Sequence, residues 1–239
     1  KLDTLVGFFL INEKPTSSKD PFALRRSAIG LLRTIIENNL TVGLRDLIDY
    51  LIRFYTEQGV KDVNKNTHLE LINFFRDRMK NILKEKRVRP DIIEASLSSH
   101  TNDNFLELYK KTLVMNKFIS KDLGKNAVST YKRAYNIIDR EKNISKSGPD
   151  AVLFKQDEEK ELFDKINDIR KAFTYKERKE SYENHLKLLS DAKVSTDKFF
   201  DNVKVNDENN DIKNNRLELL QRLCSTFNTF IDFSKLEGN

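Results

Sequence analysis

The sequence predicts an all-α protein that folds as a helical bundle in two parts. Apolar residues recur at intervals of three and four positions along most of the chain, and no stretch alternates apolar and polar residues with the period of a strand. Seven glycines and four prolines among 239 residues are few for an all-β protein, which needs many turns. The hydrophobic fraction of 38% is enough to build a core.

The first segments of the chain predict helices with recognisable ends. Residues 1–11 have the pattern of a helix already under way, in which Gly7 leaves room for a neighbouring helix. Asp20 and Pro21 predict the start of a helix that runs to about residue 38, because aspartate can cap the free N–H groups and proline suits the first helical position. A further helix is expected over 43–58.

The next helix is expected to begin with a capping box. Thr67 and Glu70 have the spacing at which each side chain can accept from the other residue's backbone N–H, and the apolar pattern continues to about residue 86. Pro90 then begins a short helix that ends near Leu97.

A polar segment over 98–104 is the best candidate for a domain boundary. We therefore expect a first helical region over 1–100 and a C-terminal helical domain over 101–239. The second part is expected to contain helices over 105–119, 123–140, 157–173 and 175–191, and a last helix that continues to Leu236.

Positive charge is concentrated in the first part of the chain. Residues 1–90 contain 17 Lys and Arg against 11 Asp and Glu, an excess of 6, whereas residues 91–239 contain 26 of each. Seven basic and two acidic residues lie within 71–90. Such a patch favours contact with phosphate, while nucleic-acid binding by the neutral second part would have to depend on a few well-placed side chains.

The sequence offers no recognisable active site. It has no glycine-rich phosphate loop, and His68, His100 and His185 are too isolated for a helix-borne zinc pair. The single cysteine, Cys224, lies on an apolar helix face and is expected to be a core residue in a reducing compartment, without a disulfide. No stretch approaches the length of apolar sequence that a membrane span requires.

Several motifs together resemble the β subunit of bacterial tetrameric glycyl-tRNA synthetase. The resemblance begins with K-L-D-T-L-V-G at Lys1 and K-D-P-F-A-L-R-R at Lys19, and it extends along the whole chain. The chain departs from the family motifs at four positions, which are Ser96, Lys204, Ile212 and Lys213. The later matching segments are Phe74–Arg78, Asp91–Leu97, Lys132–Ile137, Asp197–Val203, Lys213–Leu220 and Asp232–Leu236.

The resemblance implies a function for the chain and for its parts. It implies that the chain is the C-terminal portion of that subunit. The first region would contain the end of a histidine–aspartate type helical domain and linker helices. The second region would be a helical anticodon-binding domain of the arginyl-tRNA synthetase type. The expected function is recognition of tRNA(Gly) within a glycine–tRNA ligase. The alternative is a non-catalytic helical scaffold that binds only protein.

The resemblance also implies the setting of the whole enzyme. That enzyme would be a cytoplasmic α2β2 tetramer that uses ATP and Mg2+, with glycine activation in the α subunit. This chain alone is expected to have no catalytic activity, metal or cofactor.

Eleven basic residues are candidates for RNA binding. In the first part they could instead be solvated helix faces, and in the second part Arg216, together with Asn136, could be a buried polar group that ties helices together. Tyr131, Tyr135, Phe199 and Phe200 could stack on unpaired bases, although core packing is the better expectation for most of them. The candidates are Arg25, Arg26, Arg76, Arg78, Arg87, Arg89, Lys132, Arg133, Lys198, Lys213 and Arg216.

Overall fold

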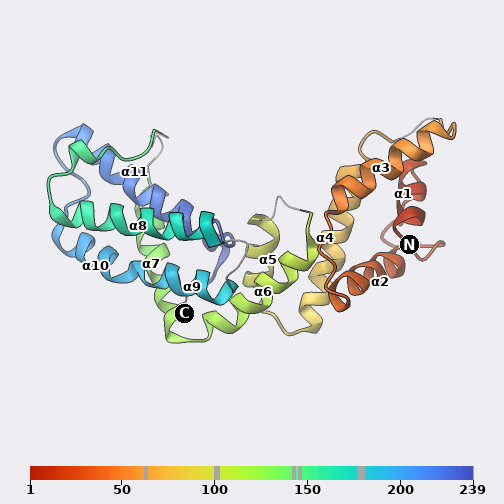
Figure 1. The fold of residues 1–239 in the computed structure, drawn as a ribbon, viewed down its shortest axis with the longest axis horizontal. Helices are drawn as coiled ribbons and strands as arrows, with labels where there is room; N and C mark the ends of the chain where they lie inside the picture. The colour runs from red at the N-terminus through yellow and green to blue at the C-terminus, as the bar shows by residue number, and fades with distance from the viewer. Residues whose placement is uncertain (62–63, 100–102, 142–143, 145–146, 177–180, 239) are drawn as a thin grey trace. The chain divides into compact units, whose positions relative to one another are not determined.

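The computed structural model is all-α throughout the residues that it describes. These are 1–61, 64–99, 103–141, 144, 147–176 and 181–238, without the side chains of 174–176. None of these residues lies in a strand, which confirms the predicted fold class. The described helices are α1 (Leu2–Leu10), α2 (Leu24–Glu37), α3 (Leu44–Glu57), α4 (Thr67–Glu85), α5 (Pro90–Ser99), α6 (Phe105–Ile119), α7 (Asp122–Ile138), α8 (Asp157–Lys176), α9 (Tyr182–Ser190), α10 (Ala192–Asn202) and α11 (Asn210–Phe227), with short 3-10 turns at Ala151–Leu153 and Phe233–Lys235 (Figure 1).

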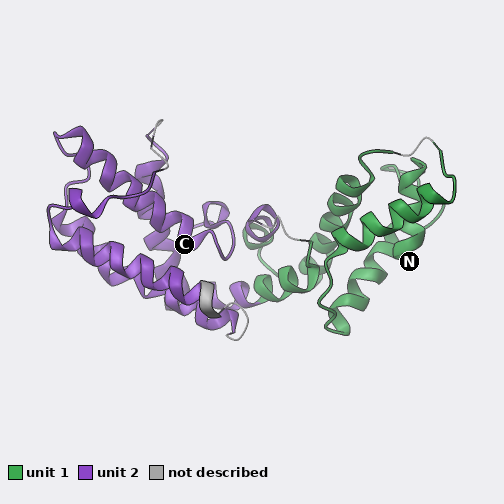
Figure 2. Cartoon of the chain, turned by 45° about the horizontal axis from the view of Figure 1, so that its top comes forward, with its two compact units in different colours: residues 1–93, 100–113 green, residues 94–99, 114–239 purple. Residues whose placement is uncertain are grey.

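The chain divides into two compact units (Figure 2). The first unit contains residues 1–93 and 100–113, and the second contains residues 94–99 and 114–239. The division therefore falls within α5 and α6, each of which contributes residues to both units.

The first unit is held together by α1 to α4. Helix α1 packs against α2, α3 and α4, and α4 packs against α2. The core includes Leu5, Phe75 and Met79, which are fully buried. The ring of Tyr55 on α3 lies over Gly7, where an added Cβ would come within 3.0 Å of its hydroxyl oxygen. The expectation that Gly7 admits a neighbouring helix is therefore confirmed.

The second unit is a bundle of α7, α8, α10 and α11, with α9 beside α7. Helix α7 packs against α11 and α10, and α8 packs against the same two helices. The buried apolar side chains that fill the space between them include Tyr131, Ile166, Phe199 and Phe227. The four helices therefore enclose one core.

The predicted start of α2 is wrong in detail. The carboxylate of Asp20 accepts from the backbone N–H groups of Leu24 and Arg25, at 2.8 and 3.1 Å, so it does cap α2. However, Pro21 lies in a turn and not at the first helical position, because Ala23 adopts a left-handed φ of 53° between that turn and the helix.

The predicted capping box at Thr67 does not form. Thr67 is buried at the first position of α4, and its hydroxyl donates to the carbonyl of Asn64 at 2.7 Å. Glu70 instead accepts from Lys14 and Asn64. The helix start is thus tied to the preceding loop.

Two expected helices of the second part also differ from the structure. Helix α8 includes residues 175 and 176, where a separate helix was expected to begin, and α9 begins at Tyr182. The last long helix ends at Phe227 and does not reach Leu236. Asn228 accepts from the backbone N–H of Phe233 at 3.0 Å and so stabilises the turn that follows α11.

Candidate nucleic-acid interface

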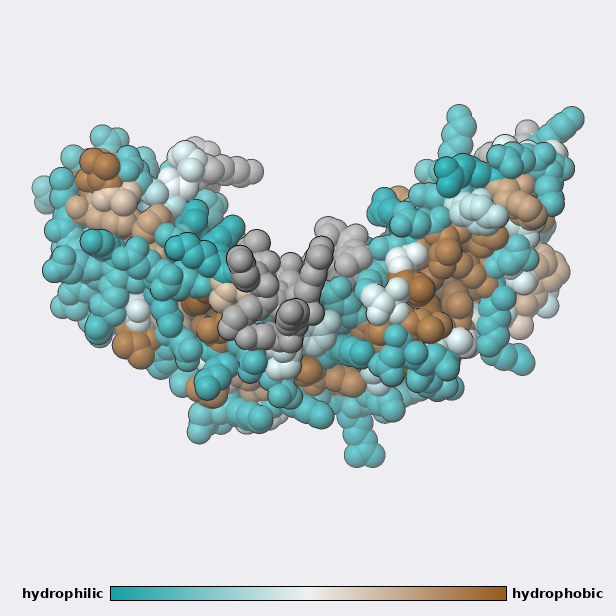
Figure 3. Space-filling view, in the orientation of Figure 1, coloured by the Kyte–Doolittle hydropathy of each residue, from teal (hydrophilic) through white to brown (hydrophobic). Residues whose placement is uncertain are grey.

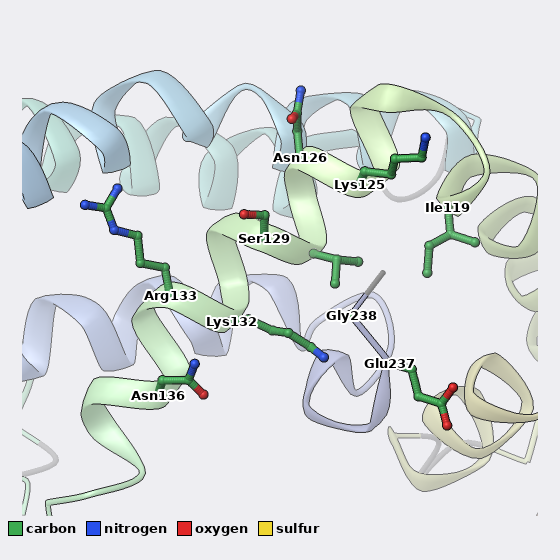
Figure 4. A pocket seen from close by; sticks show the side chains of 10 residues that line it. Ile119, Lys125, Asn126, Ser129, Lys132, Arg133, Asn136, Glu237 and Gly238 are labelled. Carbon is green, nitrogen blue, oxygen red and sulfur yellow. The ribbon is translucent and has the colours of Figure 1, made fainter.

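One face of α7 lines a pocket of about 590 Å³ in the second unit (Figure 4). Its polar lining residues recur every three or four positions, so they share one side of the helix, while Ala127, Tyr131 and Ala134 face the core. The tail residues Glu237 and Gly238 form the opposite wall. The polar residues that α7 contributes are Lys125, Asn126, Ser129, Lys132, Arg133 and Asn136.

Arg133 is held by a cluster of side chains from α10. Its guanidinium carbon lies 4.4 Å from the centre of the Phe200 ring. Its two terminal nitrogens donate to Asp197 at 3.3 Å and to Asp201 at 3.4 Å. Asp197 also accepts from Lys193, one turn earlier on α10. We call these five residues the Arg133 cluster.

The neighbouring Lys132 points toward the tail (Figure 4). A Cβ added at Gly238 would lie 3.1 Å from the amino nitrogen of Lys132, so the tail backbone passes close to the end of this side chain. Lys132 is half-buried. Asn136 is exposed at the edge of the pocket, so it is not the buried tie between helices that the sequence left open as an alternative.

Two further candidates of the second unit are surface residues in ion pairs. Lys198 binds Glu161 at 3.0 Å, and Lys213 binds Glu141 at 3.0 Å. Both remain partly accessible, with 53% and 28% of their side chains exposed. An RNA phosphate would have to compete with these carboxylates for the lysines.

Arg216, which was predicted as an RNA-binding candidate, is buried and bound to two carboxylates. Only 3% of its surface is exposed. Its guanidinium donates to Glu159 at 2.9 Å and to Asp207 at 2.8 Å. Burial works to lower the pKa of Arg216, but these two carboxylates outweigh burial and raise it. The side chain therefore joins α8, α11 and the segment before α11, as the buried alternative expected.

The aromatic candidates also divide into buried residues and surface residues. Tyr131 and Phe199 are buried, and burial raises the pKa of Tyr131 well above its ordinary value. Tyr135 stacks on Tyr131 with 5.5 Å between ring centres. Only Phe200, beneath Arg133, belongs to the polar surface, so core packing accounts for the first two residues.

The candidates of the first unit are spread over three segments. Arg26 on α2 and Arg87 after α4 are exposed. Arg25 donates to the backbone carbonyl of Thr16, and Arg89 forms an ion pair with Asp91 at 2.7 Å.

The two remaining candidates of the first unit, Arg76 and Arg78, lie on α4. Arg76 is half-buried. Arg78 lies over Phe74 at 4.5 Å, and burial lowers its pKa. Among the candidate arginines of this unit, Arg26 and Arg87 are therefore the most accessible to a phosphate.

Other reactive groups offer no second site among the described residues. No three His, Cys, Asp or Glu side chains there are grouped so as to hold a metal ion. Cys224 is buried, and burial raises the pKa of its thiol to about 12, as expected of a core residue. His68 contacts Asp49 at 2.7 Å and His185 packs on Phe173, while His100 lies outside the described residues. No helix in the described part of the chain is long and apolar enough to cross a membrane.

Asp197 and Asp201 were not predicted as site residues. They are four positions apart with Phe200 between them, a spacing that places both carboxylates on one face of a helix. That spacing was visible in the sequence. Their pairing with Arg133, which is 64 and 68 positions away, was not.

Comparison with known families matches both units. Residues 127–235 match the family model of the DALR anticodon binding domain, which covers α8 to α11 and most of α7. Most of the second unit therefore matches the class of helical anticodon-binding domains. Residues 1–98 match the family model described as glycyl-tRNA synthetase beta subunit. The chain belongs to the glycyl-tRNA synthetase beta-subunit family, as the sequence motifs indicated.

Whole-chain relatives agree with both matches. The chain is 38% identical over 236 residues to the glycine–tRNA ligase beta subunit of Rickettsia africae, and 37% identical over 243 residues to that of Rhodospirillum centenum. These matches cover 99% and 100% of this chain. The chain spans about a third of the length of these relatives, 34% in each case.

Proposed function

We propose that this chain is the tRNA-recognition portion of a glycine–tRNA ligase beta subunit. The observation that carries the proposal is the position of the α7 pocket, because four of the six polar residues that α7 contributes to it lie within the segment that matches the anticodon-binding domain. The expected ligand is tRNA(Gly), bound at its anticodon region and along its backbone. Unpaired loop bases suit a pocket of this kind better than a duplex does, since their edges are accessible.

The two units would make different kinds of contact. The first unit is proposed to grip backbone phosphates through Arg26 and Arg87, which are exposed and lie in the basic part of the chain. Contacts of this kind position an RNA without reading its sequence. The second unit, with its net charge balanced and its donors fixed by neighbours, is proposed to read bases. We therefore propose that the second unit is the anticodon-binding domain. The first unit would be the end of the preceding helical domain, together with linker helices.

The remaining steps of the reaction would occur elsewhere in the enzyme. We place glycine activation, with its ATP and Mg2+, in the α subunit of an α2β2 tetramer in the cytoplasm. This chain would bring the tRNA to that site and have no active site of its own.

Filter binding of the chain to tRNA(Gly) and to a second tRNA at several salt concentrations tests the proposal. We expect tighter binding to tRNA(Gly), with an affinity that falls as salt rises because phosphate contacts release counterions. Equal, weak binding to both tRNAs by a folded protein would contradict a reading role for the chain.

A second function, binding of protein, is favoured by one surface of the first unit. Leu47, Tyr50 and Phe54 share one face of α3, and each is between 42% and 59% exposed. Figure 3 shows hydrophobic surface over the part of the first unit that contains α3. Apolar surface of this kind is typical of a protein contact, and the α subunit is the partner we propose for it. Loss of co-purification with the α subunit in a Tyr50→Asp variant, with RNA binding unchanged, would support this function.

A further inference from the structure

We propose that the Arg133 cluster reads one unpaired base that carries an amino group, and that Asp201 is the residue that selects it. This inference rests on the proposed function and deepens it, because it names the chemistry of the contact. It assigns Asp197 a positioning role, through its bond to Arg133. The ligand class is a base such as cytosine, whose amino group can donate to a carboxylate.

The charges of the cluster argue against phosphate as its ligand. Arg133 and Lys193 are matched by Asp197 and Asp201, so the four side chains sum to zero. Both of these carboxylates lie within 3.4 Å of the guanidinium, where they would repel a phosphate that approached Arg133. A neutral base meets no such repulsion.

The geometry holds Arg133 in place before any ligand arrives. Phe200 supports the guanidinium from one side, and Asp197 and Asp201 each accept from one of its terminal nitrogens. Because Arg133 is already fixed by its neighbours, it loses little conformational entropy when a base binds. Arg133 keeps 45% of its side chain exposed, so a base can reach it from solvent.

Asp201 has the free acceptor that an amino group requires. Only its Oδ1 atom accepts from Arg133, and its Oδ2 atom has no hydrogen bond within the part of the chain that the structure describes. The side chain is 68% exposed. Asp197, by contrast, uses one oxygen for Arg133 and the other for Lys193. The two aspartates therefore differ in what they can offer a ligand.

Arginine and aspartate together complement the edge of cytosine. Its N3 and O2 atoms accept hydrogen bonds, as Arg133 requires, while its N4 amino group donates to a carboxylate. Uracil presents a carbonyl oxygen in place of that amino group, and this oxygen would face Asp201 without a proton between them. Cytosine and uracil have the same size and differ at this edge, so they form a matched pair of probes.

The test uses the full 239-residue chain and two RNA hairpins. The hairpins share one stem, and their central loop positions carry either cytosine or uridine. We expect the chain to bind the cytosine loop about tenfold more tightly, the scale of one good base contact. Asp201→Asn should remove most of this preference, because an amide can donate to the uracil carbonyl as well as accept. Asp168→Asn, which changes an exposed carboxylate on α8, is the matched control and should leave the preference unchanged.

Other outcomes overturn the inference in distinguishable ways. If Asp201→Asn tightens binding to both loops equally, the cluster faces phosphate and its carboxylates only repel it. If the unaltered chain binds both loops equally well, it binds RNA without reading this base. If it binds neither hairpin nor tRNA(Gly), the proposed function fails as well. A helical dichroism spectrum that matches that of the unaltered chain confirms that each variant is folded.

Discussion

The basic side chains of the two units differ in how they are held. In the second unit, four of the five candidates form ion pairs: Arg133, Lys198, Lys213 and Arg216. In the first unit, Arg26 and Arg87 are exposed and form no ion pair with another described residue. A charge that is already neutralised adds little to long-range attraction, but its donors are fixed in direction. Excess positive charge and ordered hydrogen-bond donors are therefore provided by separate parts of this chain.

The largest effect is expected from the buried ion pair. Replacement of Arg216 by Ala leaves Glu159 charged and fully buried without its partner, which should lower the free energy of unfolding of the second unit by about 3–5 kcal/mol. Chemical denaturation followed by circular dichroism measures this change. Lys198→Ala, which removes an exposed pair, should cost less than about 1 kcal/mol. Equal losses of stability in the two variants would show that burial does not strengthen the dependence of the fold on this ion pair.

A smaller effect, on RNA binding, is expected at Arg133. Arg133→Ala should weaken binding of tRNA(Gly) by about 1–3 kcal/mol and narrow its advantage over other tRNAs, because the side chain that we propose reads the base is removed. Arg133→Lys keeps the charge but not the planar guanidinium, so its affinity for tRNA(Gly) should decrease nearly as much as that of Arg133→Ala. Full retention of affinity by the lysine variant would mean that only charge matters there.

Replacement of the exposed arginines should change RNA binding in a different way. Arg26→Ala and Arg87→Ala together are expected to weaken all tRNAs alike and to lower the slope of log affinity against log salt by about 0.7–0.9 for each phosphate that the protein no longer neutralises. Binding titrations across a range of salt concentrations measure this slope. A weakening confined to tRNA(Gly) would transfer a reading role to the first unit.

The smallest effect is expected on the pH dependence of the stability of the first unit. A hydrogen bond from Lys14 holds the pKa of Glu70 below its ordinary value, against the opposing effect of burial. The folded pKa is the lower one, so this hydrogen bond stabilises the first unit above the ordinary pKa of glutamate. Its contribution disappears as the pH falls through the folded value. Glu70→Gln should therefore reduce the difference in stability between about pH 7 and about pH 3. An unchanged difference would show that the hydrogen bond contributes nothing measurable.

The sequence predicted the helices better than it predicted their ends. The apolar faces of α1 to α4 are visible because burial imposes a period of 3.6 residues. The turn at Pro21 and the altered start at Thr67 were missed, because tertiary contacts decide them: Glu70 accepts from Lys14, which is 56 positions away. A local motif cannot report a partner at that distance.

The candidate site was only partly predictable for the same reason. Lys132 and Arg133 were identified because a family motif contains them, and they do line the α7 pocket. The burial of Arg216 remained one of two alternatives, since the same residue type serves both surfaces and buried pairs. Whether an arginine faces solvent depends on packing between α8 and α11, and the position of Glu159 settled it.

The burial of Cys224 makes the stability of one unit measurable through a thiol that the chain already contains. The chain has no other cysteine, and this thiol lies in α11 with 3% of its surface exposed. A raised pKa keeps it protonated at neutral pH, so alkylating reagents can modify it only when the second unit opens. The rate of modification therefore reports the opening equilibrium of that unit alone. Protection of Cys224 by added tRNA would measure, at a buried position, how strongly the bound RNA holds the bundle closed.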